Sequence, residues 1–264
     1  MLEGLNLYYS LAGAFVSFLV GLTGVGGGSL MAPILILIFG INPALAVGTD
    51  LWFAAITKSI GGAIHHKFGS PDWKIVMRLA AGSLPAAIIT VVWLALAHDG
   101  KLDAGPLMIL LGIALLVTAV MMLLKPRLHN PLRRLRDTMG PSLRSRQLTA
   151  TVAGGAIIGA LVTLTSVGAG ALVAVLLTII YPLRLRAKAI VGTDIIHAVP
   201  LTLVAGIGHS FLGNVDTWLL ASLLIGSIPG IILGSLASGR VNDNLVRYAL
   251  AAMLVVSAVK MITS

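Results

Sequence analysis

Long apolar runs, separated by short polar or glycine-rich stretches, set the pattern of this chain. We predict ten apolar segments, five in each half. In the first half they cover residues 5–22, 27–40, 44–65, 73–97 and 105–124, and in the second 149–165, 168–181, 188–210, 216–238 and 243–262. Most approach the roughly 20 residues that a helix needs to cross a bilayer. Strand-like alternation is absent, so the predicted fold class is an all-α membrane protein, a polytopic helix bundle.

Two of these segments, 27–40 and 168–181, are too short to cross about 30 Å of hydrocarbon comfortably. Each of them opens on a glycine-rich stretch. We therefore expect both to be short broken or re-entrant helices.

The two halves of the chain form an internal sequence repeat. Val47-Gly48-Thr49-Asp50 recurs as Val191-Gly192-Thr193-Asp194, 144 residues later. At the same offset His65 matches His209, Asp72 matches Asp216, and Ser83-Leu84-Pro85 matches Ser227-Ile228-Pro229. The glycine-rich stretches match at an offset of 142, with Val25-Gly26-Gly27-Gly28 corresponding to Val167-Gly168-Ala169-Gly170. Residues 1–124 then form a first transmembrane repeat and residues 149–264 a second. Duplicated halves with glycine-interrupted segments are typical of secondary transporters, whose substrate site lies at the repeat interface.

The stretch between the repeats, 125–148, is strongly basic. From Lys125 to Gln147 it holds seven Lys or Arg and one Asp, or +6 of the net +9. Basic loops stay on the cytoplasmic side, so we predict a cytoplasmic linker, an outside N-terminus and a multi-pass protein of the inner (plasma) membrane. Because five segments per half is odd, the two repeats should be inverted relative to each other. Inverted repeats favour alternating access over a simple pore.

Composition supports this class. The chain is 58% hydrophobic and 10% charged, with a mean hydropathy of +1.02, whereas soluble domains carry about 25% charged residues. Most of the positive charge belongs to the linker, so we expect no nucleic-acid partner, and the lipid bilayer is the main surrounding. The sequence leaves a homodimer open. It has no cysteine, which excludes disulfides and thiol chemistry.

Asp50 and Asp194 are the two acidic residues, of nine, that fall inside apolar stretches. A carboxylate at bilayer depth is costly and usually has a partner or a task. One interpretation is that each caps a helix N-terminus. The other is that they couple transport to protons. His197 follows Asp194 at helical spacing, so the two could share a proton.

The glycine-rich stretches are the predicted substrate site. Irregular backbone at the start of a helix offers free N–H groups and the positive end of a helix dipole to an anion. The candidate residues are Thr23, Gly26, Gly27, Gly28 and Ser29 in the first repeat, and Ser166, Gly168 and Gly170 in the second. The alternative is that the glycines only let helices pack closely.

Lys58 lies well inside an apolar segment, eight residues after Asp50. On a helix it would lie about 80° round from Asp50, so the two could share a cavity wall. It could neutralise Asp50 or bind an anionic substrate, with Thr49 and Thr193 as further ligands. Its repeat counterpart is Thr202. The histidines are too scattered for a metal site, and we expect no cofactor and no catalytic residue.

With Gly24-x-Gly26-Gly27-Gly28-x4-Pro33, the Gly-Thr-Asp motif and the duplication, the chain resembles the TauE/SafE family of sulfite and organosulfonate exporters over nearly its whole length. The resemblance implies an inner-membrane transporter for small sulfur-containing anions. The second repeat departs from the motif, because Ala169 replaces a glycine and Val175 stands where Pro33 would map.

The predicted function is therefore a secondary transporter that exports a small sulfur-containing anion, such as sulfite or sulfoacetate, by alternating access. Three alternatives stay open: a cation or proton-coupled transporter that uses the Asp and His residues, a passive anion channel, and an intramembrane aspartyl protease. The protease is disfavoured, because such enzymes use Gly-x-Gly-Asp where this chain has Val-Gly-Thr-Asp.

Overall fold

The computed structural model describes residues 6–23, 30–65, 71–100, 102–124, 129–181, 185, 187–238 and 241–264; of residues 63–65, 129–145, 187, 188 and 243 it describes the backbone alone. Within these ranges the regular structure is helical throughout. The glycine-rich stretch 24–29 lies outside the described residues.

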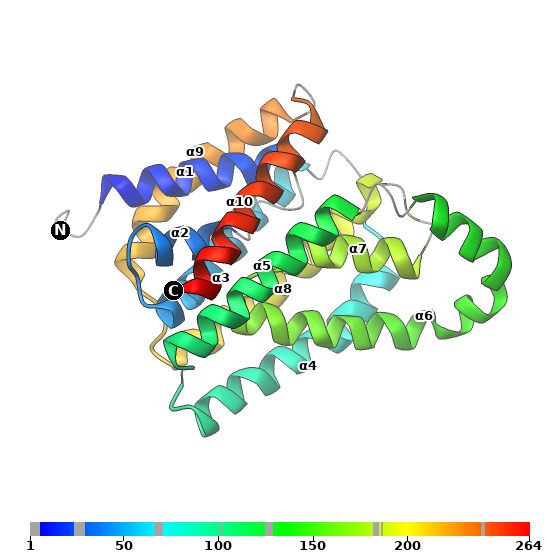
Figure 1. Ribbon diagram of the computed structural model, residues 1–264, viewed down its shortest axis with the longest axis horizontal. Helices are drawn as coiled ribbons and strands as arrows, with labels where there is room; N and C mark the ends of the chain where they lie inside the picture. Colours follow the sequence, from blue (N-terminus) through cyan, green and yellow to red (C-terminus); the bar gives the residue numbers. More distant parts are fainter. Residues whose placement is uncertain are drawn as a thin grey trace.

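Ten helices follow one another along the chain (Figure 1). They are α1 (Leu7–Thr23), α2 (Met31–Leu37), α3 (Pro43–His65), α4 (Trp73–Ala97), α5 (Ala104–Leu124), α6 (His129–Thr165), α7 (Ala171–Ile180), α8 (Ala187–Phe211), α9 (Thr217–Ala237) and α10 (Asp243–Thr263). They confirm the all-α prediction, and each of the ten predicted segments corresponds to one helix. The main difference is α6, which begins at His129 and so runs through most of the predicted linker before it reaches the apolar part.

The two short helices, α2 and α7, are shorter than the predicted segments 27–40 and 168–181 that contain them. At about 1.5 Å per residue, the 7 residues of α2 and the 10 of α7 extend only about 10 and 15 Å. Neither is long enough to cross a bilayer alone. Six other helices or parts of helices, among them Arg146–Thr165 of α6, are long and apolar enough to do so.

Asx side chains begin several helices. The carboxylate of Asp72 accepts hydrogen bonds from the backbone N–H groups of Lys74 and Ile75 at the start of α4. Asp216 does the same for Trp218 and Leu219 at the start of α9. These carboxylates satisfy N–H groups that would otherwise lack a partner in the first turn.

The two halves interlock. The most extensive contacts join α1 with α9, α4 with α6, α3 with α8, and α5 with α10, and every one of these pairs takes one helix from each half. In Figure 1 the α1–α9 pair and the α4–α6 pair lie on opposite sides of α3 and α8.

The helix pairs are also related by symmetry. Each helix of the first half has a counterpart five helices later (α1 and α6, α2 and α7, and so on). When every helix is replaced by its counterpart, the α1–α9 pair becomes the α6–α4 pair, and the α3–α8 and α5–α10 pairs are unchanged. The packing therefore has a twofold pseudosymmetry. The inverted orientation of the repeats in the membrane stays a prediction.

Glycines set the closest helix contacts, again in equivalent places. A Cβ at Gly82 of α4 would collide with the carbonyl oxygen of Val152 on α6, and one at Gly226 of α9 would collide with that of Ser10 on α1. Gly82 and Gly226 are 144 residues apart, and Ser10 and Val152 are 142 apart. The alternative that glycines serve helix packing is thus correct for these positions, in keeping with small residues at membrane helix interfaces.

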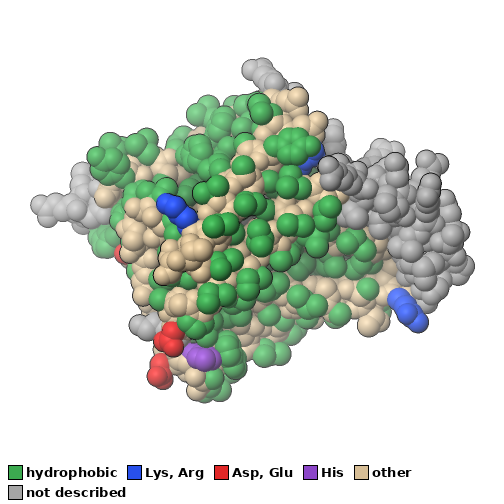
Figure 2. Space-filling view, viewed as in Figure 1, with side chains coloured by type: hydrophobic (Ala, Val, Ile, Leu, Met, Phe, Trp, Pro, Cys, Tyr) green, Lys and Arg blue, Asp and Glu red, His purple; other side chains and the backbone are tan. Residues whose placement is uncertain are grey.

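Apolar side chains cover the outside as well as the core. The face in Figure 2 is largely hydrophobic and carries few charged side chains. Large exposed apolar residues include Ile89 and Leu96 of α4, Ile113 of α5 and Leu233 of α9. Such extensive apolar patches do not suit water but do suit lipid tails.

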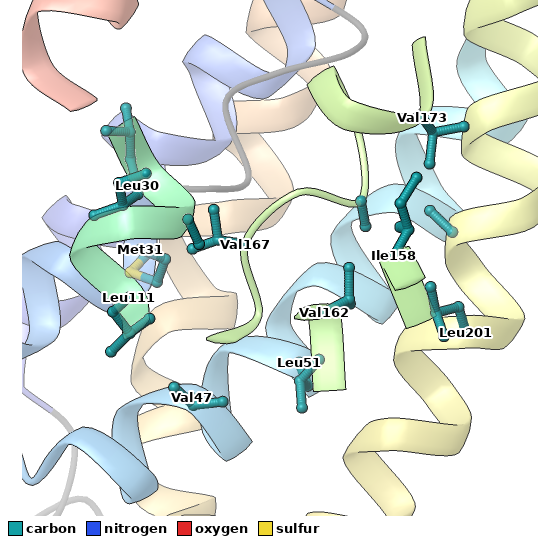
Figure 3. Packing of buried hydrophobic residues seen from close by; sticks show 14 of the residues in the cluster. Leu30, Met31, Val47, Leu51, Leu111, Ile158, Val162, Val167, Val173 and Leu201 are labelled. Carbon is teal, nitrogen blue, oxygen red and sulfur yellow. The ribbon is translucent and has the colours of Figure 1, made fainter. Parts of the chain in front are cut away.

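A single cluster of buried apolar residues joins both halves in the centre. It includes Leu30 and Met31 at the start of α2, Leu51 of α3, Ile158 of α6 and Leu201 of α8. Figure 3 shows the connection between α6 and α7 passing through this cluster, with its Val167 on the side of Leu30 and Met31. Irregular backbone at this depth is tolerated because protein, and not lipid, surrounds it.

The packing at Gly82 and Gly226 predicts that adding a single methyl group at either position will destabilise the protein. We expect Gly82→Ala and Gly226→Ala each to lower the free energy of unfolding by about 1–3 kcal/mol, measured as thermal unfolding in detergent. Gly105→Ala is the matched control, because a Cβ there meets nothing within 4 Å. Equal stability of all three variants would contradict the packing.

The predicted inversion can be tested because the chain has no cysteine. Lys74 and Thr217 are both exposed at the first turns of the equivalent helices α4 and α9. We expect a membrane-impermeant maleimide to label Thr217→Cys on intact cells, and Lys74→Cys only after permeabilisation. Labelling of both from the same side would rule out inverted repeats.

Candidate functional site

The central helices α3 and α8 carry the two Gly-Thr-Asp motifs. Asp50 and Asp194 lie in the interior of these helices, seven residues from the first residue of each. The interpretation that they cap helix N-termini is therefore wrong. The caps are Asp72 and Asp216 at the starts of α4 and α9, where side-chain oxygens reach free N–H groups.

The threonines of the two motifs link the halves. The hydroxyl oxygen of Thr49 accepts a hydrogen bond from the backbone N–H of Asp216, at 3.1 Å. Thr193 accepts the equivalent bond from the backbone N–H of Asp72, at 3.0 Å. The threonine of each Gly-Thr-Asp motif thus binds the backbone of the N-cap residue of a long helix in the other half. This is a structural task that the sequence did not reveal for either threonine.

Charged side chains converge where α3 faces α8. Asp50 and Asp194 are fully buried, and Lys58 lies within electrostatic reach of both of them. His197, one turn after Asp194, also lies within electrostatic reach of Lys58. The structure thus brings together the two pairs that the sequence suggested, Asp50 with Lys58 and Asp194 with His197, in one cluster.

The connection between α6 and α7 completes this cluster. The ammonium group of Lys58 donates a hydrogen bond to the backbone carbonyl oxygen of Ala169. Ser166, at the start of the connection, lies beside the carboxylate of Asp50, as does the backbone of Ala32 in α2. Ser166 has φ +55° and Gly168 has φ +107°, so the chain breaks the helix here with two residues in the left-handed region, which glycine tolerates and serine seldom adopts.

Much of the polar capacity at this centre is unused among the described residues. Neither carboxylate oxygen of Asp50, nor the hydroxyl of Ser166, nor Nδ1 of His197 has a hydrogen-bond partner there, although all of these atoms are buried. Buried polar groups normally have partners, and each exception needs an explanation.

Hydroxyl groups flank the cluster in a pattern that differs between the halves. Ser83 of α4 bonds to Nε2 of His197 at 2.8 Å. Its counterpart Ser227 of α9 bonds instead to Ser17 and Thr57, each at 2.7 Å. The position equivalent to His197 is Phe53, which is why Ser227 has no imidazole partner.

Sequence reasoning noticed the repeated Ser-x-Pro motif but assigned it no role. The signal that could have identified it was its position, because Ser83 and Ser227 each lie in a long apolar helix two residues before an internal proline. Their hydroxyl groups are fully buried. Both serines bridge helices beside the central cluster.

Other predicted residues lie elsewhere. Thr23, at the end of α1, donates to the carbonyl oxygen of Leu19 at 2.9 Å. Gly26, Gly27, Gly28 and Ser29 lie outside the described residues. Gly168 and Gly170 belong to the connection that carries Ala169. Among the described residues, no group of three or more His, Asp or Glu side chains could hold a metal ion.

Comparisons with known proteins agree with a membrane transporter. The family model described as sulfite exporter TauE/SafE matches residues 9–261. A probable membrane transporter protein of Bacillus subtilis (strain 168), YjnA, is 40% identical over 257 residues, covering 96% of this chain and 98% of its own. A second from the same organism, YdhB, is 28% identical and covers 83% and 85%. The probable membrane transporter protein MJ0441 of Methanocaldococcus jannaschii is 27% identical and covers 92% and 89%. No solved structure matches the chain.

The crossed threonine bonds predict a stability effect that is shared by both halves. We expect Thr49→Val and Thr193→Val each to lower the free energy of unfolding by about 1 kcal/mol, because each removes the hydroxyl that accepts from a part-buried backbone N–H of the other half. Thr118→Val is the control, since that hydroxyl bonds only within its own helix, to Ala114. Thermal unfolding in detergent measures the effect, and losses no larger than that of Thr118→Val would contradict the assignment.

Proposed function

This chain belongs to the sulfite exporter TauE/SafE family, and on that premise we propose that it is a secondary transporter that exports a small sulfur-containing anion across the inner membrane by alternating access. Sulfite, sulfoacetate and related sulfonates are the proposed substrates. The observation that carries the proposal is the cluster that the half-buried Lys58 forms with the buried Asp50, Asp194 and His197 at the contact between the two repeats. Transporters built from repeats place substrate and coupling ion at such an interface.

Lys58 is the proposed anion ligand. An ammonium group has three donors and no acceptor, and in this conformation one donor is used by the carbonyl of Ala169. An oxygen of a sulfite or sulfo group would replace that carbonyl as acceptor. We assign further contacts to the hydroxyl of Ser166 and to the backbone of Gly168 and Gly170, where the N–H of Gly170 would exchange its present acceptor, the carbonyl oxygen of Gly168, for the anion. We assign the equivalent role in the first repeat to Thr23, Gly26, Gly27, Gly28 and Ser29.

Asp50, Asp194 and His197 are the proposed proton-coupling groups. Two carboxylates against one ammonium leave a surplus negative charge in a buried place, which a proton would remove. Coupling is not needed for export as such. An inside-negative membrane potential already favours the exit of an anion by about 2.3 kcal/mol per charge per 100 mV.

The interlocked halves support alternating access. Each long helix of one repeat packs on a helix of the other, so one set of helices can rock against its counterpart around a fixed centre. Thr49 and Thr193, which bridge the halves at equivalent places, would lie where such a movement pivots.

A cation transporter is the second candidate, and the surplus carboxylate is the observation that favours it. A protease is a weaker fit, because an aspartyl dyad shares one proton between two adjacent carboxylates, whereas here Lys58 interacts with both of them.

Flux in proteoliposomes tests the anion proposal. We expect Lys58→Met to lower saturable sulfite or sulfoacetate flux about tenfold or more, because removing one partner of a buried charge cluster costs about 2 kcal/mol or more. Lys260→Met, at an exposed position of α10, is the matched control. The membrane potential and the pH gradient are imposed separately, and size-exclusion profiles establish that the variants are folded.

Two results would count against the proposal. Wild-type protein that moves none of these sulfur anions would exclude the substrate class. Cation flux that persists in Lys58→Met would favour the second candidate.

A further inference from the structure

Two equivalent serines beside the central cluster have different partners. Ser227 of α9 is bonded to the hydroxyl groups of Ser17 and Thr57, each at 2.7 Å. Ser83 of α4 has one partner among the described residues, Nε2 of His197, at 2.8 Å. The two halves therefore place different chemistry at equivalent points, and this difference needs a physical cause.

The cause is that the second repeat lacks the two hydroxyl partners. Gly159 stands at the position equivalent to Ser17, and Leu201 at the position equivalent to Thr57. A Cβ at Gly159 would collide with the backbone of Ser83, so no side chain fits between α6 and α4 at this point. Ser83 is thus left with the imidazole of α8 as its partner.

This hydrogen bond decides which nitrogen of His197 carries the hydrogen. The hydroxyl of Ser83 reaches no carbonyl oxygen among the described residues, whereas Thr90 of the same helix donates to the carbonyl of Ala86 at 2.8 Å. Ser83 therefore donates to Nε2, because the opposite arrangement would leave its own hydrogen without an acceptor in a buried place. A neutral imidazole that accepts at Nε2 carries its hydrogen at Nδ1.

Nδ1–H of His197 is then a donor that lacks an acceptor. The side chain is fully buried, and Nδ1 has no hydrogen-bond partner among the described residues. Buried donors normally have acceptors. An oxygen of an anion would be such an acceptor, whereas a cation would need a lone pair at this place.

The register of the central helices places this imidazole near the level of Lys58. A Cβ at Gly62 of α3 would meet Ile195 of α8, and a Cβ at Gly206 of α8 would meet Trp52 of α3. The two helices therefore run antiparallel, and Lys58 lies level with the turn of α8 that follows the imidazole. A charged donor and a neutral donor thus occur at the same depth of the contact between the halves.

We propose that Nδ1–H of His197 binds an oxygen of the transported anion together with Lys58, and that Ser83 is the positioning residue that keeps the hydrogen on Nδ1. This inference rests on the proposed function and adds a ligand to the same site. Because Phe53 occupies the equivalent place in the first repeat, the ligand occurs in one half only. It selects for an oxyanion and against a cation.

The donor persists when His197 takes part in proton coupling. A proton that reaches His197 binds Nε2, and Ser83 then turns its hydroxyl to accept from Nε2–H. Nδ1–H stays in place in both charge states. The imidazole can therefore hold the anion before and after the proton moves.

Sulfite flux in proteoliposomes, driven by a membrane potential without a pH gradient, tests the ligand. We expect His197→Phe to raise the KM for sulfite about tenfold or more, the effect of losing one hydrogen bond to a charged group. The fold accommodates this ring, since Phe53 is buried at the equivalent place. His197→Asn should restore the KM to within about threefold of wild type, because its Nδ2 donor is bonded to Cγ as Nδ1 is.

The matched control is His98→Phe, the same substitution at an exposed position, which should behave as wild type. Size-exclusion profiles establish that the variants are folded. A wild-type KM in His197→Phe would overturn the proposal, and so would a His197→Asn variant no better than His197→Phe.

The tautomer can be observed directly by NMR of the full chain labelled with nitrogen-15 histidine, because protonated and unprotonated ring nitrogens differ in chemical shift. Comparison with His197→Asn identifies the signals of His197 among the six histidines. We expect the hydrogen on Nδ1 in wild type and in Ser227→Ala, and a loss of this preference in Ser83→Ala. A wild-type hydrogen on Nε2 would overturn the proposal, and an unchanged tautomer in Ser83→Ala would remove Ser83 from it.

Adding sulfite to the labelled protein separates this inference from the proposed function. We expect sulfite to displace the Nδ1 signal of His197. If wild-type protein shows this displacement but does not move sulfite, the transport proposal fails and the ligand assignment stands. If it moves sulfite and the Nδ1 signal stays unchanged, transport stands and His197 is not a ligand.

Discussion

Charges that lie at bilayer depth must be neutralised by the protein itself, and in this chain the two halves do so together. Lys58 belongs to the first half, whereas Asp194, one of the two carboxylates within its electrostatic reach, and its carbonyl acceptor, Ala169, belong to the second. Water cannot replace these partners inside the membrane. The position of α3 against α8, and hence of the helices around them, depends on this contact.

The same dependence on the other half recurs in the frame of the molecule. The N-terminal residues of α4 and α9 are bonded to threonines of the opposite repeat, and the glycine contacts join α1 to α9 and α4 to α6. Because the main helix pairs all cross between halves, neither repeat can bury its polar groups alone. The duplicated sequence thus makes one interlocked body.

Within this symmetric frame, a few substitutions make the centre asymmetric. Lys58 has Thr202 as its repeat counterpart, and His197 has Phe53. The change at His197 redirects Ser83 to an imidazole, whereas Ser227 bonds to hydroxyl groups. A duplicated scaffold supplies two equivalent places, and differences of one side chain give them different chemistry. A site with one cation and one surplus carboxylate follows from this.

The number, type and order of the helices could be predicted from the amino-acid sequence, because the length and composition of an apolar run are local properties that decide whether it can cross a bilayer. It also identified Asp50, Asp194, Lys58 and His197, since charged or polar groups inside apolar runs are conspicuous and costly. Its capping interpretation of the two aspartates was wrong, because the true caps, Asp72 and Asp216, are visible only where helices begin in space.

Which of these residues lie close to one another depends on how the helices pack. The crossed bonds of Thr49 and Thr193, the Ser83–His197 pair and the approach of Ser166 to Asp50 join residues up to 167 positions apart. Spacing along a helix fixes which face a residue occupies, but it contains no information on the helix that packs against that face. Long-range hydrogen bonds and the convergence of Asp50, Asp194 and His197 on Lys58 are properties of that packing.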